Sequence, residues 1–122
     1  MDETRNDLRK RTTDFALRII RMYSSLPKST VAQTLGKQVL RSGTSVGAQF
    51  RESQRAKSDA DFVNKLEGVL QEADETAYWL ELLVTAEIVP AAKLEPLRKE
   101  TDELIAIIVT IVTKVKKRIG KL

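Results

Sequence analysis

The sequence contains no cysteine and no histidine. Without cysteine there can be no disulfide and no thiol nucleophile, and without either residue the commonest zinc ligands are missing. The usual general base at neutral pH is missing too, because that role most often belongs to histidine. We therefore expect a protein that is not an enzyme and that uses no metal or other cofactor. A chain free of cysteine also fits a reducing, cytoplasmic location.

Residues that break or turn a chain are scarce as well. Only five glycines and three prolines occur among 122 residues, and aromatic residues make up 5% of the chain. Sparse turn punctuation favours long helices joined by few loops. The length and the 42% hydrophobic content suit one domain, covering residues 1–122, that can bury its own core.

No hydrophobic run is long enough to cross a membrane. The longest apolar stretch, residues 104–112, is flanked by charged residues and falls far short of the roughly 20 residues that a spanning helix needs. The first residues, MDETRNDLRKR, contain no apolar segment of the kind found in signal peptides. Both absences predict a cytoplasmic protein without a membrane partner.

The apolar residues that are present recur at helical spacing, and capping signals separate them into helices. The first helix is predicted from about Arg5 to Ser24. The second is predicted from Thr30, which forms a capping box with Gln33, to about Lys57.

A second capping box, Ser58 with Asp61, predicts a sharp turn and the start of a third helix that keeps its apolar register to Val84. The stretch between Pro90 and Pro96 is predicted to hold only a short, separate helical turn. The fourth helix is expected from Leu94 or Glu95 to Ile119, with Gly120 as its C-terminal cap.

Four long amphipathic helices with short connections indicate an all-α fold, an antiparallel up-down-up-down four-helix bundle. In residues 104–115 the apolar side chains spread over more than half of the helix circumference. Such a wide apolar face is typical either of a deeply buried helix or of one that is covered in an assembly. Both interpretations stay open at this point.

One stretch, Gln38 to Glu52, carries polar residues where a core helix would carry apolar ones. They recur at three- and four-residue steps and so share a helical face: Arg41, Ser42, Ser45, Gln49 and Glu52. Buried polar groups need partners, and the adjacent helix of a hairpin would supply them.

A hairpin that turns near Lys57 would place Arg41 near Glu72 and Glu75, and Glu52 near Phe62 and Lys65. Trp79, beside Glu75, would then cover these polar pairs. We also expect Gly43, Gly47 and Ala48 to let the second and third helices approach closely, and a buried Arg41 whose loss would cost a few kcal/mol. The predicted structural polar core is Arg41, Ser42, Ser45, Gln49, Glu52, Glu72, Glu75 and Trp79.

The same residues could be interpreted as catalytic. Glu72 and Glu75 could act as general acid and base, or hold a metal together with Glu52. Metal sites in helical bundles, however, generally use Glu-x-x-His motifs, which this chain cannot form. Ser42 and Ser45 have no base to activate them as nucleophiles. The structural interpretation is therefore favoured.

These motifs together resemble a known family. The segment QVLRSGTSVGAQFRES, followed by KSDADFVNKLEGVLQEADETAYWLELL, resembles the four-helix-bundle proteins also called large-subunit ribosomal RNA intervening-sequence proteins. The resemblance covers nearly the whole chain, with one departure at Gln49, where the family pattern has asparagine. It implies a short bundle that assembles as a ring-like homopentamer. The family is also similar to the accessory variability protein of diversity-generating retroelements, a basic pentamer that works with a reverse transcriptase and RNA.

Charge is distributed unevenly along the chain, whose net charge is +4. Residues 58–103 hold twelve acidic and four basic residues, whereas the rest holds seventeen basic and five acidic ones. In an up-down-up-down bundle the start of the first helix and the ends of the second and fourth meet at one pole. The predicted nucleic-acid contacts there are Arg9, Lys10, Arg11, Arg51, Arg55, Lys57, Lys114, Lys116, Lys117, Arg118 and Lys121.

A basic pole of this kind suits phosphate contacts, although lysine and arginine near helix C-termini also complement the helix dipole and aid solubility. No base-reading motif is present, so binding to RNA or DNA should be electrostatic and weakly sequence-selective. The sequence thus predicts a non-catalytic homo-oligomer that binds nucleic acid, most simply structured RNA. The alternative is an accessory subunit whose main contact is a reverse transcriptase.

Overall fold

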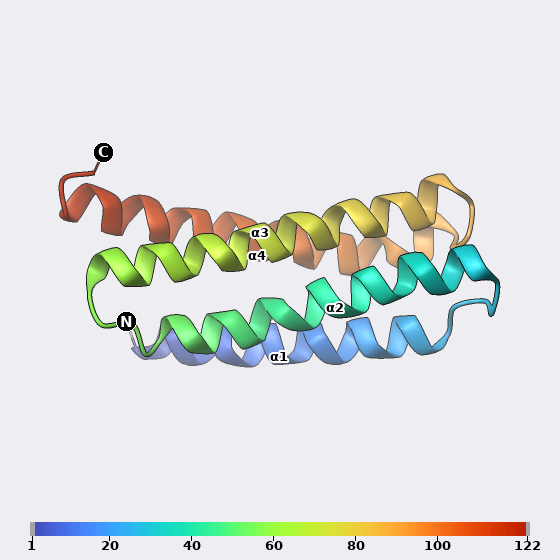
Figure 1. The fold of residues 1–122 in the computed structure, drawn as a ribbon, viewed down its shortest axis with the longest axis horizontal. Helices are drawn as coiled ribbons and strands as arrows, with labels where there is room; N and C mark the ends of the chain where they lie inside the picture. Colours follow the sequence, from blue (N-terminus) through green and yellow to red (C-terminus); the bar gives the residue numbers. More distant parts are fainter. Residues whose placement is uncertain (1, 122) are drawn as a thin grey trace.

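A computed structural model describes residues 2–121 and confirms the all-α fold (Figure 1). Its four helices are α1 (Asp2–Ser24), α2 (Thr30–Ser53), α3 (Asp59–Thr85) and α4 (Ala91–Arg118). Successive helices run in opposite directions and each packs on the next, whereas α1 and α4 touch only sparsely. The start of α1, the α2–α3 connection and the end of α4 lie at the same end of the bundle, which we call the basic pole (Figure 1).

The core lies along the bundle axis and draws on all four helices. Phe15 and Ile19 of α1, Leu66 of α3 and Leu104 of α4 are almost completely buried. Each such side chain contributes roughly 1.5–3 kcal/mol through removal of apolar surface from water. In α4, Leu104, Ile108, Val112 and Val115 are buried, whereas Ile105, Ile107 and Ile111 are half-buried and Val109 is exposed.

The glycines of α2 face α1, so the predicted role of two of them is corrected. A Cβ on Gly43 would lie 2.8 Å from Ile19 Cγ1, and one on Gly47 would lie 3.3 Å from Thr12. Gly36 is also packed against α1, while Ala48 is exposed. These glycines therefore allow close approach of α1 and α2, because their register turns them away from α3.

Side-chain caps set the starts of α2 and α3, and the cap of α2 lies one residue before the predicted one. Ser29, not Thr30, caps α2, accepting a hydrogen bond from the backbone N–H of Ala32 at 3.3 Å. Gln33 does not complete a capping box, because its amide donates to the carbonyl oxygen of Pro27 instead. Helix α2 ends at Ser53, earlier than predicted, and a short turn leads to α3.

The predicted start of α3 is confirmed. Ser58 Oγ accepts from the Asp61 N–H at 3.1 Å, and Asp61 Oδ2 accepts from the Lys57 N–H at 3.0 Å. The hydrogen bond from the Lys57 backbone holds the pKa of Asp61 below its ordinary value, with Lys65 contributing in the same direction.

The last helix begins earlier than predicted. Helix α4 starts at Ala91 after Pro90, so the stretch before Pro96 is its first turns and no separate helical turn exists there. Pro96 lies in the second turn of α4, where its missing N–H removes one hydrogen bond of the helix, to the carbonyl oxygen of Ala92. At the other end Gly120 adopts φ +76°, the left-handed conformation that favours glycine after a helix.

Within residues 2–121, no helix is both long and apolar enough to cross a membrane.

Candidate nucleic-acid interface

Three of the predicted cations lie on α1, and two of them, Lys10 and Arg11, are paired with carboxylates. Arg11 donates to both carboxylate oxygens of Glu100 on α4, at 2.6 and 3.1 Å, and approaches Glu103 at 3.4 Å. The hydrogen bond to Glu100 raises the pKa of Arg11 above its ordinary value. Lys10 pairs with Asp14 at 2.8 Å on the exposed side of the same helix. Arg11 therefore joins α1 to α4.

Two further cations join α4 to α3. Lys116 Nζ lies 2.9 Å from Glu67, and Arg118 Nη2 lies 3.0 Å from Asp59. The carboxylates belong to the first half of α3, which shares the basic pole with the end of α4. These two carboxylates belong to the acidic excess of residues 58–103. By pairing with Lys116 and Arg118 they lower the net positive charge of the basic pole.

The remaining predicted cations make no ion pair with any carboxylate of the described residues. Most are exposed at the ends of α2 and α4. Arg51 differs in that its Nη2 donates to Thr13 Oγ1 of α1 at 3.2 Å. This unpaired set comprises Arg9, Arg51, Arg55, Lys57, Lys114, Lys117 and Lys121. It comes from three segments that are distant in the sequence.

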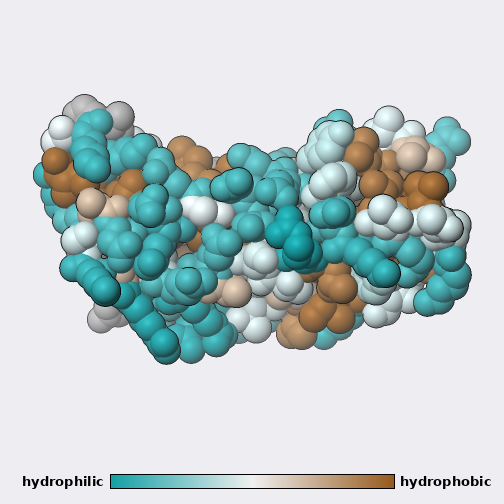
Figure 2. All heavy atoms as spheres, viewed as in Figure 1, coloured by the Kyte–Doolittle hydropathy of each residue, from teal (hydrophilic) through white to brown (hydrophobic). Residues whose placement is uncertain are grey.

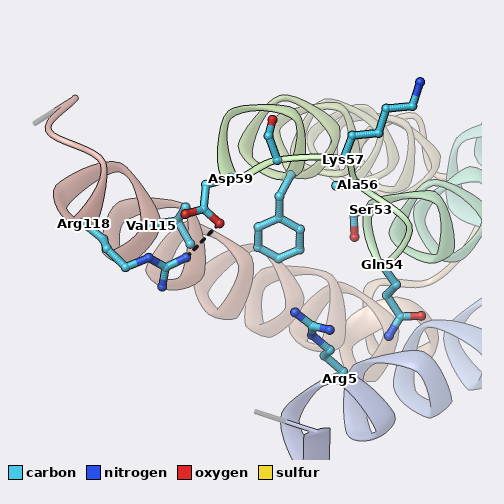
Figure 3. Close-up of a pocket in the computed structure, with 10 residues that line it drawn as sticks. Arg5, Ser53, Gln54, Ala56, Lys57, Asp59, Val115 and Arg118 are labelled. Atoms are coloured by element: carbon cyan, nitrogen blue, oxygen red, sulfur yellow. Dashed lines mark hydrogen bonds and ion pairs between the residues drawn. The ribbon is translucent and has the colours of Figure 1, made fainter.

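Arg5 belongs to the same pole and was not among the predicted contacts. It lines a cavity of about 280 Å³ between the start of α1, the α2–α3 turn and the end of α4 (Figure 3). Arg118 and Asp59 line the opposite side of this cavity, and Lys57 lies on its rim with its ammonium group directed away. The sequence could have identified Arg5 as a pole residue, because the start of the first helix was already assigned to that end of the bundle.

The predicted polar face of α2 lies against α3. Arg41 Nη2 donates to Glu75 Oε1 at 2.8 Å, and Arg41 Nη1 lies 3.6 Å from Glu72 Oε1. Gln49 donates to the other oxygen of Glu72 at 3.3 Å. The expected burial of Arg41 is wrong, however: its side chain is 55% exposed, and the pairs lie at the edge of the α2–α3 interface.

A buried polar contact between α2 and α3 joins two hydroxyl groups. Thr76 Oγ1 donates to Ser42 Oγ at 2.8 Å, and both residues are fully buried. Thr76 was missed in the sequence, although it lies four residues after Glu72 and therefore on the same helical face. Ser45, by contrast, bonds only within its own helix, to the carbonyl oxygen of Arg41.

Glu52 and Trp79 lie at opposite ends of this interface. Glu52 is exposed and shares a shallow pocket with Lys65, as the hairpin register predicts. Trp79 is half-buried against the core, and its ring centroid lies 5.1 Å from that of Tyr78. Its Nε1 is buried and has no hydrogen-bond partner among the described residues. Within residues 2–121 no hydrogen bond or aromatic contact joins Trp79 to Arg41, so its predicted covering role stays a prediction.

Chemically, the exposed cations of the basic pole are suited to binding anions. No group of three or more metal-ligating side chains occurs within the described residues 2–121. The features left free are the exposed cations of the pole and the cavity between them. Such cations contact phosphates without reading sequence.

Comparisons with known proteins agree with the four-helix fold. The family described as 23S rRNA-intervening sequence protein matches residues 4–110. A crystal structure of a protein of unknown function, from the S23 ribosomal protein family of Bacteroides thetaiotaomicron VPI-5482, is 38% identical in sequence. The similarity covers 89% of this chain and 97% of that one, with a TM-score of 0.83. No curated protein sequence matches significantly.

Proposed function

The chain belongs to the 23S rRNA-intervening sequence protein family, and from that premise we propose that it is a non-catalytic protein that binds structured RNA through its basic pole. The observation that carries the proposal is the convergence of unpaired cations from three segments at one end of the bundle. Arg55 and Lys57 come from the α2–α3 turn, and Lys114 and Lys117 come from the last turns of α4.

The physical basis is release of counterions from the RNA. Each cation that neutralises a phosphate releases condensed counterions, so affinity falls as salt rises. Among the ten residues that line the cavity, Phe62 is the one aromatic residue, and the pole offers no stacking platform for a run of bases. Binding should therefore tolerate many sequences and follow charge and shape.

We further propose that the working form is a ring-like homo-oligomer, most simply a pentamer. Exposed apolar side chains support this, because a monomer gains nothing from leaving them in water. Leu17 and Ile20 on α1 are each 42% exposed, and Figure 2 shows one cluster of hydrophobic atoms at the lower edge of the bundle, where α1 runs. A ring would repeat the basic pole around its axis and strengthen its field.

The same exposed apolar side chains favour a second candidate function, that of an accessory subunit. In that case the main contact would be a reverse transcriptase, and RNA would be held in the joint complex. An adjacent reverse transcriptase gene would favour this candidate, whereas a position inside a ribosomal RNA gene would favour the first.

The proposal predicts salt-dependent RNA binding that depends on the unpaired cations. We expect the triple variant Arg55→Gln, Lys114→Gln, Lys117→Gln to weaken binding of a structured RNA at low salt. The slope of log affinity against log salt should become shallower by about 2–3, roughly one per lost phosphate contact. Fluorescence anisotropy across a salt series measures both quantities. These three positions test the pole better than Lys116 and Arg118, which are tied to α3.

A charge-matched control comes from the opposite pole. Lys28, Lys37 and Lys93 are exposed and lie near the α1–α2 connection or the start of α4. Changing all three to glutamine removes the same charge and should leave the salt slope close to that of the wild type. Equal losses in the two triple variants would show that only net charge matters, and the basic pole would not be the binding site.

A further inference from the structure

The cavity at the basic pole is a candidate site for a specific ligand, in addition to the general electrostatic attraction of phosphates. Its volume of about 280 Å³ is close to the lower limit for small-molecule pockets, roughly 300 Å³, and so suits a ligand no larger than one nucleotide. Its walls come from α1, the α2–α3 turn, the first turns of α3 and the last turn of α4. It forms where α1 and α4 touch only sparsely, which leaves room between their ends.

Two guanidinium groups enter this cavity from opposite sides. Arg5 extends from α1 toward it, and Arg118 extends from α4 with one N–H bonded to Asp59 (Figure 3). A guanidinium has five N–H donors, so the ion pair with Asp59 orients Arg118 and leaves most of its donors free. Paired guanidinium groups of this kind suit a phosphate, which accepts several hydrogen bonds at once.

The interior of the cavity offers groups that suit a base. Phe62 is half-buried and lines the cavity together with the apolar Val115. Gln54 also lines it, and within residues 2–121 its carboxamide makes no hydrogen bond, so a donor and an acceptor are free for the edge of a base. An aromatic face accepts any base, because every base has a π-face.

We propose that this cavity binds one unpaired nucleoside monophosphate unit, with its phosphate between Arg5 and Arg118 and its base on Phe62. A paired base is stacked inside its duplex and cannot enter, so the unit must come from a loop, a bulge or a strand end. The inference rests on the proposed RNA-binding function, to which it adds a preference for RNA with unpaired nucleotides.

The test compares two RNAs that carry the same number of phosphates, a blunt duplex and a duplex with a single-stranded overhang. We expect the wild-type protein to bind the overhang RNA about tenfold more tightly at the same salt concentration. Phe62→Leu keeps an apolar side chain but removes the aromatic face. The affinity of this variant for the overhang RNA should therefore fall to its affinity for the blunt duplex. Affinity for the blunt duplex itself should not change.

Matched variants distinguish the loss of a cavity contact from effects of a substitution elsewhere in the protein. Tyr78→Leu removes an exposed aromatic ring outside the cavity and should preserve the preference for the overhang. Arg5→Gln changes an exposed residue near the chain start and should weaken binding of adenosine 5′-monophosphate several-fold, as followed by NMR titration of the free nucleotide. Thermal melting of each variant shows whether it is folded.

The possible outcomes bear on different claims. Equal binding of both RNAs by the wild type, or an unchanged preference in Phe62→Leu, would overturn the cavity proposal and leave electrostatic RNA binding intact. Binding of adenosine 5′-monophosphate that depends on Phe62, without binding of either RNA, would support a nucleotide site and contradict the proposed RNA function. Absence of binding by both RNAs and by the nucleotide would contradict both proposals.

Discussion

At the scale of single residues, exposure decides how much each polar contact stabilises the fold. Arg41 contacts two carboxylates but is 55% exposed, so solvent screens both ion pairs. Exposed pairs of this kind contribute roughly 0–1 kcal/mol. The Ser42–Thr76 hydrogen bond, in contrast, joins two fully buried residues. A buried polar group left without its partner costs about 1–3 kcal/mol.

We therefore predict that Thr76→Val destabilises the protein more than Arg41→Ala does. The free energy of unfolding should fall by roughly 1–3 kcal/mol in Thr76→Val, because Ser42 loses its buried partner. It should fall by at most about 1 kcal/mol in Arg41→Ala, and less at high salt. Urea denaturation at low and high salt measures both. A larger, salt-independent loss in Arg41→Ala would mean that this ion pair is shielded from water.

At the scale of helices, side-chain caps fix where α2 and α3 start. The α3 start is the clearest case, since Ser58 Oγ accepts from the Asp61 N–H while Asp61 reaches back to the Lys57 N–H. These bonds satisfy N–H groups that have no partner inside the helix. They also hold the turn that lines one side of the cavity at the basic pole.

Loss of this cap should be measurable. Ser58→Ala removes the acceptor for the Asp61 N–H and should lower the free energy of unfolding by about 1 kcal/mol. Ser25→Ala provides the control, because Ser25 is an exposed serine that bonds to the Met22 carbonyl and caps no helix start. Thermal or urea unfolding compares the two. Equal stability of both variants would show that the α3 start is held by packing alone.

At the scale of the whole molecule, the bundle leaves apolar surface that its own core does not cover. Leu17 and Ile20 on α1, Val109 on α4 and Tyr78 on α3 are all exposed, on several sides of the bundle. Scattered exposed apolar residues are common on monomers, so only their concentration along α1 points to an interface. Assembly through that edge would leave the two poles free.

The proposed assembly has a direct test. The mass of the protein in solution should be a multiple of the 13.7 kDa chain, five-fold for the pentamer, by light scattering or native mass spectrometry. Leu17→Glu with Ile20→Glu should lower that mass, because charges cannot be buried there without partners. The control Val31→Glu changes an exposed residue at the start of α2. A monomeric wild-type protein would rule out the ring.

Much of the fold followed from patterns that act over short distances. Helical spacing and the Ser58 cap were enough to predict four antiparallel helices, and Gly120 was enough to predict the last helix end. The start of α4 was placed at Leu94 or Glu95 because the stretch between Pro90 and Pro96 was assigned to a connection, whereas the helix begins at Ala91. The role of Gly43 was misassigned because sequence spacing does not reveal which neighbour a buried face meets.

The sequence by itself determined the class of fold, the order of the helices and the gathering of basic residues at one pole, because periodicity, capping and topology depend on residue order alone. Only the tertiary structure decided which of those cations are neutralised, since Arg11, Lys116 and Arg118 meet carboxylates from distant segments. It alone also placed Arg41 in solvent, and it brought Arg5, Gln54 and Phe62 around one cavity. Burial and pairing are properties of positions in space, and side chains far apart in the chain acquire them only when the helices pack.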